Sequence, residues 1–280
     1  MNVICEDFDY KYSVLMPVYI KDNAEWLKVS IDSMLSQTVS ADEFVIVKDG
    51  KVTKELDNLL EDYNKKYPNL FKIYEMKENV GLGKVLEYGV KVCSNEFIAR
   101  MDADDYSKSD RCERQLEIFK LNNNYSVVGS NVGEFFNDIN NVISQVVLPE
   151  KHEEIRKYAK RRCPIRHPAL MYKKSDVIDS GNYGDYFHAQ DYNLVVKMLM
   201  NNCIFYNIQE PLTLMRVTSD FYRRRGGLKQ LNVIYKLKKE FWEMGFYSFN
   251  DFFVSTSINV IICLLPNFIR KLIYKNFLRA

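Results

Sequence analysis

The chain has 280 residues, of which 47% are hydrophobic and 27% are charged, so it can bury a substantial core and is not expected to be disordered. Its 39 basic and 37 acidic residues leave a formal net charge of +2, and the absence of any long block of one sign gives no case for a nucleic-acid partner. The six cysteines include no CxxC pair and have no nearby histidines at zinc spacing, which argues against a zinc site or a disulfide framework and favours a reducing cytoplasm.

The first hundred residues alternate between strand-like and helix-like patterns. Amphipathic helical patterns lie around residues 26–35, 56–63 and 83–92, and the strand-like runs between them are YSVLMPVY, FVIVKDG, LFKIYE and EFIARMD. This alternation predicts right-handed βαβ units in one Rossmann-like, mostly parallel sheet flanked by helices. In such an α/β fold, ligands bind beyond the carboxyl ends of the strands. Three of these ends carry polar signals: Pro17-Val18-Tyr19, Lys48-Asp49-Gly50 and Asp102-Ala103-Asp104.

Beyond residue 105 the alternation loosens. Helical patterns cover about 110–121, 150–162 and 190–200, and the strand-like runs are YSVVGSNV, VISQVVLP, IFYNI and LTLMRV. No repeat or low-complexity linker separates this part from the first. We therefore expect residues 1–225 to form one domain, with halves over about 10–105 and 106–225, and residues 226–280 to form a helical C-terminal appendage.

The C-terminal region is apolar but does not read as a membrane span. The run 252–265 is interrupted by polar residues and stopped by Pro266, so it is shorter than the roughly 20 apolar residues a spanning helix needs. The following NFIRKLIYKNFLRA has the pattern of a basic amphipathic helix. Two interpretations are open: the segment lies on an anionic membrane surface, or it packs on the domain. The N-terminal residues lack the features of a secretory signal, so we expect the protein to stay inside the cell.

Asp102 and Asp104 are the strongest candidates for a metal site. Because they lie one residue apart at a strand end, both side chains should point to the same side, where a cation would relieve their repulsion. Oxygen ligands suit Mg²⁺ or Mn²⁺ bridging to a diphosphate. The alternative is a solvated turn in which Asp105 or Ser109 caps the next helix.

Asp49 ends another strand at the same edge. Its carboxylate could accept the imide N–H of a uracil ring, and its alternative role is that of an ordinary Asp-Gly turn.

These motifs together resemble one enzyme family. The ordered set of PVY, Asp-Gly, ENVGLGK and the aspartate pair is similar to the inverting GT-A glycosyltransferases of family 2, especially the bacterial O-antigen, capsule and exopolysaccharide enzymes of the amylovoran-type group. The resemblance runs from about residue 12 to residue 227. It implies a GT-A fold in which the first half binds the nucleotide sugar and the second half binds the acceptor.

The same resemblance implies the donor-binding residues. Asp102 and Asp104 would hold Mn²⁺ or Mg²⁺ on the donor diphosphate, and the surrounding positions would be Pro17, Tyr19, Asp49 and Gly81. Many relatives have an aspartate where this chain has Lys48. The resemblance therefore supports sugar-nucleotide binding more strongly than uridine specificity.

Asp191 in HAQDYNLVVKML resembles the aspartate of the family's Glu-Asp motif, with Gln190 in place of the glutamate. The implied role of Asp191 is that of the catalytic base, which removes the proton of the acceptor hydroxyl. An aspartate stabilised by the helix dipole is the alternative. His167, before the apolar ALMY, and Gln190 are candidates for the acceptor side.

The segment RVTSDFYRRRGG resembles the basic loop that closes over the diphosphate in the family. Its candidates for diphosphate binding are Arg216, Arg223, Arg224 and Arg225, and a solvated basic loop is the alternative.

The resemblance implies transfer of a hexose from UDP-galactose, UDP-glucose or a UDP-N-acetylhexosamine to a polyprenyl-diphosphate-linked saccharide, with a β linkage formed. We expect a cytoplasmic protein that lies peripherally on the inner face of the membrane. Two alternatives are an inactive sugar-nucleotide-binding or assembly protein and a nucleotidyltransferase. The latter should carry a glycine-rich loop after the first strand, but PVYIKDN contains no glycine. An oxidoreductase would need GxGxxG, and Gly81-Leu82-Gly83 lacks the third glycine.

Overall fold

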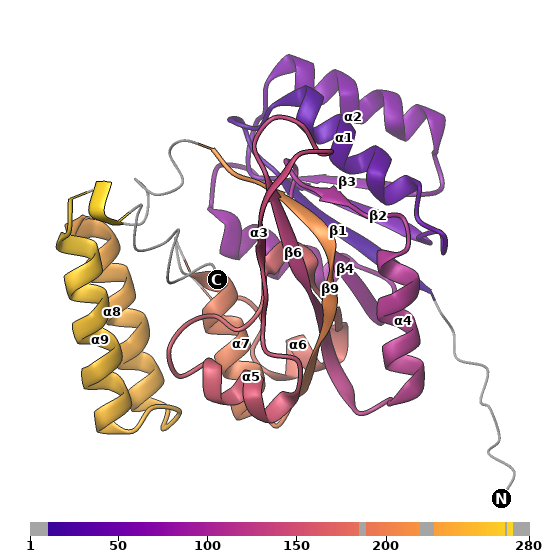
Figure 1. The fold of residues 1–280 in the computed structure, drawn as a ribbon. Coiled ribbons are helices and arrows are strands. Elements are labelled where there is room, and N and C mark those ends of the chain that lie inside the picture. The colour runs from indigo at the N-terminus through magenta and orange to yellow at the C-terminus, as the bar shows by residue number, and fades with distance from the viewer. Residues whose placement is uncertain (1–10, 185–188, 219–226, 267, 271–280) are drawn as a thin grey trace, which may run out of the picture.

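The first four strands form one parallel sheet, as their alternation with helices predicts (Figure 1). The computed structural model describes residues 11–184, 189–218, 227–266 and 268–270. These residues contain a nine-stranded sheet in the order β3-β2-β1-β4-β8-β6-β9-β5, with β7 paired to β6. The strands are β1 (Tyr12–Val18), β2 (Glu43–Lys48), β3 (Phe71–Glu75), β4 (Phe97–Arg100), β5 (Tyr106–Ser107), β6 (Tyr125–Phe135), β7 (Val142–Val146), β8 (Met171–Lys173) and β9 (Ile204–Arg216).

Helices cover both faces of this sheet (Figure 1). They are α1 (Ala24–Leu35), α2 (Lys54–Lys66), α3 (Leu82–Val92), α4 (Arg111–Leu121), α5 (His152–Tyr158), the 3₁₀ helix η1 (His167–Ala169), α6 (Lys174–Asp179), α7 (Gln190–Met200), α8 (Leu228–Glu243) and α9 (Phe249–Leu264). The predicted α/β class with a mostly parallel sheet is confirmed.

The central strand β1 is buried along its whole length, which is typical of a parallel strand covered on both faces. Its alternate side chains enter two cores. Leu15 packs in the cluster that includes α3, whereas Val14 and Met16 pack in the cluster that includes α1. The sheet is therefore held rigidly at the strands whose carboxyl ends carry the polar signals.

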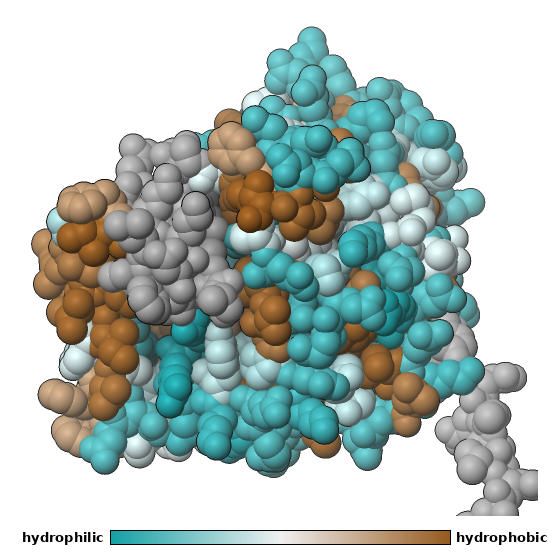
Figure 2. Space-filling model, viewed as in Figure 1, coloured by the Kyte–Doolittle hydropathy of each residue, from teal (hydrophilic) through white to brown (hydrophobic). Residues whose placement is uncertain are grey.

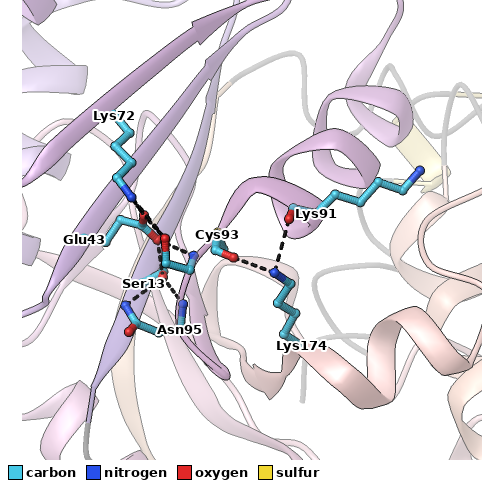
Figure 3. Close-up of polar contacts among 8 residues, drawn as sticks. Ser13, Glu43, Lys72, Lys91, Cys93, Asn95 and Lys174 are labelled. Carbon is cyan, nitrogen blue, oxygen red and sulfur yellow. Dashed lines mark hydrogen bonds and ion pairs between the residues drawn. The ribbon is translucent and has the colours of Figure 1, made fainter.

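A polar network ties the opposite, amino-terminal ends of these strands together (Figure 3). The buried Glu43 carboxylate accepts hydrogen bonds from Ser13 Oγ at 2.6 Å and Ser94 N at 2.7 Å, and it pairs with Lys72 Nζ at 2.5 Å. Lys174 Nζ donates to the carbonyls of Lys91 and Cys93 at the end of α3. Such a cation satisfies carbonyls that the helix itself leaves free.

Two predictions for the second half differ from the structure. IFYNI and LTLMRV are one strand, β9, because its pairing with β6 passes from Ile208 to Pro211 and leaves Gln209 and Glu210 as a bulge. A bulge lets a strand continue through a proline, which cannot donate to the ladder. The helix expected over 150–162 is shorter and spans α5 alone.

The helices α8 and α9 form a pair at one side of the molecule (orange to yellow in Figure 1). Phe241 of α8 is buried against Tyr192 of α7, and Lys160 Nζ lies 2.8 Å from an Asp251 carboxylate oxygen of α9. The boundary proposed near residue 225 and most of the NFIRKLIYKNFLRA segment lie outside the described residues. None of the described helices combines the length and hydrophobicity that crossing a membrane requires.

Candidate active site

The loop after β4 gathers three carboxylates. Ligand oxygens of Asp102, Asp104 and Asp105 all lie within 4.8 Å of one another. The loop is fixed by backbone contacts: Met101 N donates to Leu15 O at 3.1 Å, and Ser30 Oγ donates to Asp102 O at 2.6 Å. Oxygen-only donors at this spacing fit a hard divalent cation such as Mg²⁺ or Mn²⁺.

Crowding of these groups changes their acidity. Burial, together with the neighbouring Asp102 charge, raises the pKa of Asp104 to about 6. Burial and the charges of Asp104 and Asp102 raise the pKa of Asp105 well above its ordinary value. Repulsion of this kind is relieved by a bound cation.

Neither Asp105 nor Ser109 caps the next helix, α4. The residue before α4 is Asp110, whose side chain makes no capping bond. Asp105 instead accepts a hydrogen bond from Arg216 N at 2.8 Å, which joins the aspartate loop to the end of β9.

Arg100 was missed by the sequence reasoning, although it is the last residue of β4 and immediately precedes the aspartate loop. Its side chain is only 1% exposed and is hydrogen-bonded and ion-paired to Asp102. Its Nε and Nη1 atoms have no hydrogen-bond partner within the described part of the chain. The only available signal was a basic residue closing the apolar run FIAR. A guanidinium this deeply buried needs carboxylates around it.

A fourth carboxylate, Asp22, also lies near the loop and was not predicted. It accepts a hydrogen bond from Tyr19 N at 2.8 Å in the turn after β1. Burial raises the pKa of Asp22 to about 7, with smaller contributions from the charges of Asp104 and Asp102. The signal was present in PVYIKDN, where an acid follows the strand end closely.

Asp49 joins the end of β2 to the loop before α3. Its carboxylate accepts hydrogen bonds from Val80 N at 2.7 Å and from Gly81 N at 3.1 Å. Gly50 follows with a φ of 77°, a conformation that favours glycine. A carboxylate offers about four acceptor positions, so two backbone donors leave room for one more donor such as an imide.

The neighbouring Lys48 is engaged elsewhere. Its ammonium pairs with Asp57 of α2 at 2.8 Å and with Glu75 of β3. In place of a second aspartate, this position therefore supplies a structural ion pair among β2, β3 and α2.

Asp191 is the second residue of α7 and is partly buried. Burial raises its pKa, while a hydrogen bond from its own neighbour, Tyr192 N at 2.8 Å, and the positive charge of Arg100 oppose that rise. This position suits both the helix-dipole interpretation and a base that must bind a proton. Gln190 is buried beside it.

His167 lies at the start of η1 and is buried. Its Nε2 is 2.8 Å from the hydroxyl of Tyr183. Burial and the nearby Arg100 charge hold the pKa of His167 well below its usual range. The imidazole is therefore neutral at physiological pH and can exchange hydrogen bonds without adding charge.

Arg216, at the end of β9, lies against the aspartate loop. Its guanidinium stacks between the rings of Trp26 and Phe135, each 4.5 Å away, and its Nε donates to Asp104 O at 3.1 Å. The other predicted arginines, Arg223, Arg224 and Arg225, lie outside the described residues. Pro17 is buried in β1, whereas Tyr19 is exposed just beyond it.

Comparison with known proteins gives the family. The model of glycosyl transferase family 2 matches residues 13–179, which include the strand ends, the aspartate loop and His167. This chain belongs to glycosyltransferase family 2.

Curated relatives of the glycosyltransferase match along nearly its whole length. It is 35% identical over 270 residues to the UDP-Gal:alpha-D-GlcNAc-diphosphoundecaprenol beta-1,3-galactosyltransferase of Escherichia coli, a match that covers 96% of this chain and 97% of that protein. It is 28% identical to the amylovoran biosynthesis glycosyltransferase AmsE of Erwinia amylovora, covering 94% and 98% of the two chains. The predicted resemblance to family 2 and to the amylovoran-type group is confirmed.

Solved structures confirm the fold of the enzyme. Residues 1–349 of S. aureus TarS, solved in complex with UDP-GlcNAc, superpose with a TM-score of 0.64 at 16% identity, covering 96% of this chain and 71% of that one. The glycosyltransferase therefore has the predicted GT-A fold.

The buried charge of Arg100 acts on both the aspartate loop and Asp191 in this glycosyltransferase. Arg100 acts electrostatically on the carboxyl groups of Asp102, Asp104 and Asp191, and on His167. The predicted metal residues and the predicted base thus belong to one electrostatic cluster, although they are about 90 positions apart in the sequence.

Proposed function

We propose that this glycosyltransferase moves a hexose from a UDP-sugar, with inversion, to a saccharide carried on a polyprenyl diphosphate in surface polysaccharide synthesis. The observation that carries the proposal is the clustering of Asp102, Asp104 and Asp191 around the buried Arg100. A diphosphate-binding group and a proton acceptor are the two functions that inverting transfer requires.

The aspartate loop supports a role in holding the donor. Asp102 gives one carboxylate oxygen to Arg100, which leaves its other oxygen and the Asp104 carboxylate for a ligand. A divalent cation bound there, Mn²⁺ or Mg²⁺, would neutralise charge on the leaving diphosphate. Pro17, Tyr19, Asp49 and Gly81 are proposed to surround the nucleoside at the same sheet edge, and Arg216 to support the loop.

Asp191 is proposed as the base. The acceptor hydroxyl gives its proton to the Asp191 carboxylate as its oxygen bonds to the anomeric carbon and the bond to the diphosphate breaks. Attack from the opposite face inverts an α-linked donor and gives a β linkage. Burial raises the pKa of Asp191, which makes it a better proton acceptor, and the charges of Arg100 and Arg166 oppose that rise. His167 and Gln190 are proposed to line the acceptor side.

The acceptor class follows from the relatives. The Escherichia coli protein is named for a diphosphoundecaprenol-linked saccharide, and the match covers 96% of this chain and 97% of that protein. Action on a lipid-linked acceptor would place the enzyme on the cytoplasmic membrane surface.

An inactive sugar-nucleotide-binding protein remains the alternative, because Gln190 and Lys48 depart from the family's acidic residues. The two proposals differ in turnover and not in donor binding.

The test measures release of nucleoside diphosphate from UDP-, GDP- and dTDP-sugars, with Mn²⁺ or with a chelator. We expect one UDP-sugar to be consumed only with metal, and Asp104→Ala to lose both turnover and donor affinity. Asp191→Asn should bind the donor as the wild type does but lose at least a hundredfold in rate. The exposed-turn variant Asp138→Asn should match the wild type. Donor binding without turnover in the wild type, over a broad acceptor range, would favour the inactive protein.

A further inference from the structure

The outer face of α9 is apolar and exposed. Its side chains are Phe249, Phe253, Val254, Ile258, Ile261 and Leu264, which are 52–63% exposed. At helical spacing these positions fall on one side of the helix across its whole length. Phe268, which follows, is 68% exposed. Figure 2 shows hydrophobic surface, in brown, gathered along the edge of the molecule where Figure 1 places α8 and α9.

The exposure of this face does not come from poor packing of α9. On the inner side Ser255 and Cys263 are buried, and Phe252 stacks on Trp242 of α8 with ring centroids 5.6 Å apart. The amino-terminal end is fixed by a capping box between Ser248 and Asp251. The helix is thus held firmly while its outer face stays largely exposed in the described part of the chain, and a contiguous exposed apolar surface of this kind marks an interaction site.

Charge distinguishes between the surfaces that could cover it. Asp251, the one charged residue of α9, points its carboxylate to Lys160 of the domain. From residue 252 to residue 280 the sequence contains no acidic residue but four basic ones. One of them, Arg270, is buried and donates to backbone carbonyls at the end of α9, and the other three are Lys271, Lys275 and Arg279. An apolar face followed by a segment whose charged residues are all basic is complementary to anionic lipid.

The shape of the surface agrees with a bilayer. Sixteen residues make a helix about 24 Å long, which is shorter than a bilayer's hydrocarbon core, and its inner side is packed on α8. Trp242, 41% exposed, and Phe249 lie at one end of the face, and such rings are favoured at the level of the lipid head groups.

We propose that the outer face of α9 seats in the interfacial layer of an anionic bilayer, with the helix lying parallel to the membrane. This membrane contact rests on the proposed function, because it would serve to hold the active site against a lipid-linked acceptor. It differs from the sequence-based expectation, in which residues beyond 266 alone met the membrane.

The test uses the full chain and vesicles of phosphatidylglycerol and phosphatidylethanolamine, with phosphatidylcholine vesicles for comparison. Ile258→Ser/Ile261→Ser removes two side chains from the face. Leu121→Ser/Ile143→Ser makes the same kind of change at exposed positions on α4 and β7. Sedimentation gives the partition coefficient, and thermal melting shows that all variants are folded.

We expect the wild type to bind the anionic vesicles, and the α9 double variant to bind them roughly tenfold more weakly or worse, since two half-exposed isoleucines lose their apolar contact. The control should stay within about twofold, and added salt should weaken binding. Equal binding by the α9 variant and the wild type, or no binding by the wild type, overturns the proposal. A wild-type dimer that the α9 variant disrupts, without vesicle binding, would assign the face to a second copy instead.

Donor turnover separates this inference from the proposed function. UDP-sugar hydrolysis without vesicles should be unchanged in the α9 variant. If the wild type hydrolyses no donor but binds vesicles through α9, the proposed function fails and the membrane surface stands.

Discussion

Replacing Arg100 with methionine tests whether the buried guanidinium organises the site. The change keeps the length and flexibility of the chain but removes the charge from a position that is 1% exposed. Asp102 then loses its ion-pair partner, while its own side chain is 31% exposed and can be partly hydrated. Breaking a buried pair by removing one partner costs about 3–5 kcal/mol, and partial hydration of Asp102 puts the expected loss near the lower value, about 3 kcal/mol.

A loss of about 3 kcal/mol corresponds to a fall of roughly 6–12 °C in the melting temperature of a chain of this size. Arg100→Lys keeps the charge without the planar fork, so we expect a smaller fall. Thermal unfolding followed by circular dichroism measures both variants against the wild type.

The pH dependence of turnover gives a second measurement that a purely structural role would not change. Burial raises the pKa of Asp191 and Arg100 opposes that rise, so Arg100→Met should raise it further. A base is active when deprotonated, and the acidic limb of UDP-sugar hydrolysis should therefore move to higher pH in Arg100→Met and stay in place in Arg100→Lys. A wild-type melting temperature and an unmoved limb in Arg100→Met would refute the reasoning, and an equal shift in both variants would show that charge is not the cause.

Two further predictions concern the frame of the site. Burial opposes ionisation of Glu43, but hydrogen bonds from Lys72, Ser13 and Ser94 outweigh it and lower its pKa. The stabilisation by the ionised carboxylate is therefore present above the ordinary glutamate pKa and is lost as pH falls through the lowered one. Urea unfolding should show Glu43→Gln less stable than wild type at pH 7, with the gap closing as the solution is made acidic enough to protonate Glu43. Gly50→Ala would place a Cβ 2.8 Å from Asn79 N at a φ of 77°, so it should lower the free energy of unfolding by about 3 kcal/mol and weaken donor binding. The control Gly245→Ala, at a φ of 80° with open space around it, should lower the free energy of unfolding by about 1 kcal/mol and leave the donor affinity unchanged.

The parallel half of the fold could be predicted because its signals are local. Its strands are short, largely apolar runs, and each of the first three is followed by an amphipathic helix. The continuity of β9 could not be predicted, because Pro211 looks like a strand breaker and only the partner strand β6 shows that the bulge is accommodated.

The residues of the candidate site also divide into those that local sequence could predict and those that it could not. Asp102 and Asp104 lie one residue apart at a strand end, a spacing that by itself indicates a cation site, so the cluster was predictable. Asp22 and Arg100 carry no such spacing, and their importance comes from burial next to charges that are brought there by other elements. The outer face of α9 was visible as an apolar run, but which of its residues are exposed depends on how α8 covers it.

A buried arginine beside crowded carboxylates also explains how the site can exist before the donor arrives. Asp102, Asp104 and Asp105 lie in the loop after β4 and Asp191 lies in α7, and bringing these four groups together without a positive charge would strongly oppose folding. Because Arg100 is part of β4 itself, its charge is present whenever these carboxylates come together. The fixed charge therefore favours this arrangement of the carboxylates before any ligand binds, and under the proposed function the groups would need little rearrangement when a donor and its cation bind. On this argument the chain needs a basic residue at position 100 for folding as much as for transfer, which is why the loss of stability and the shift of the pH limb should appear together in Arg100→Met.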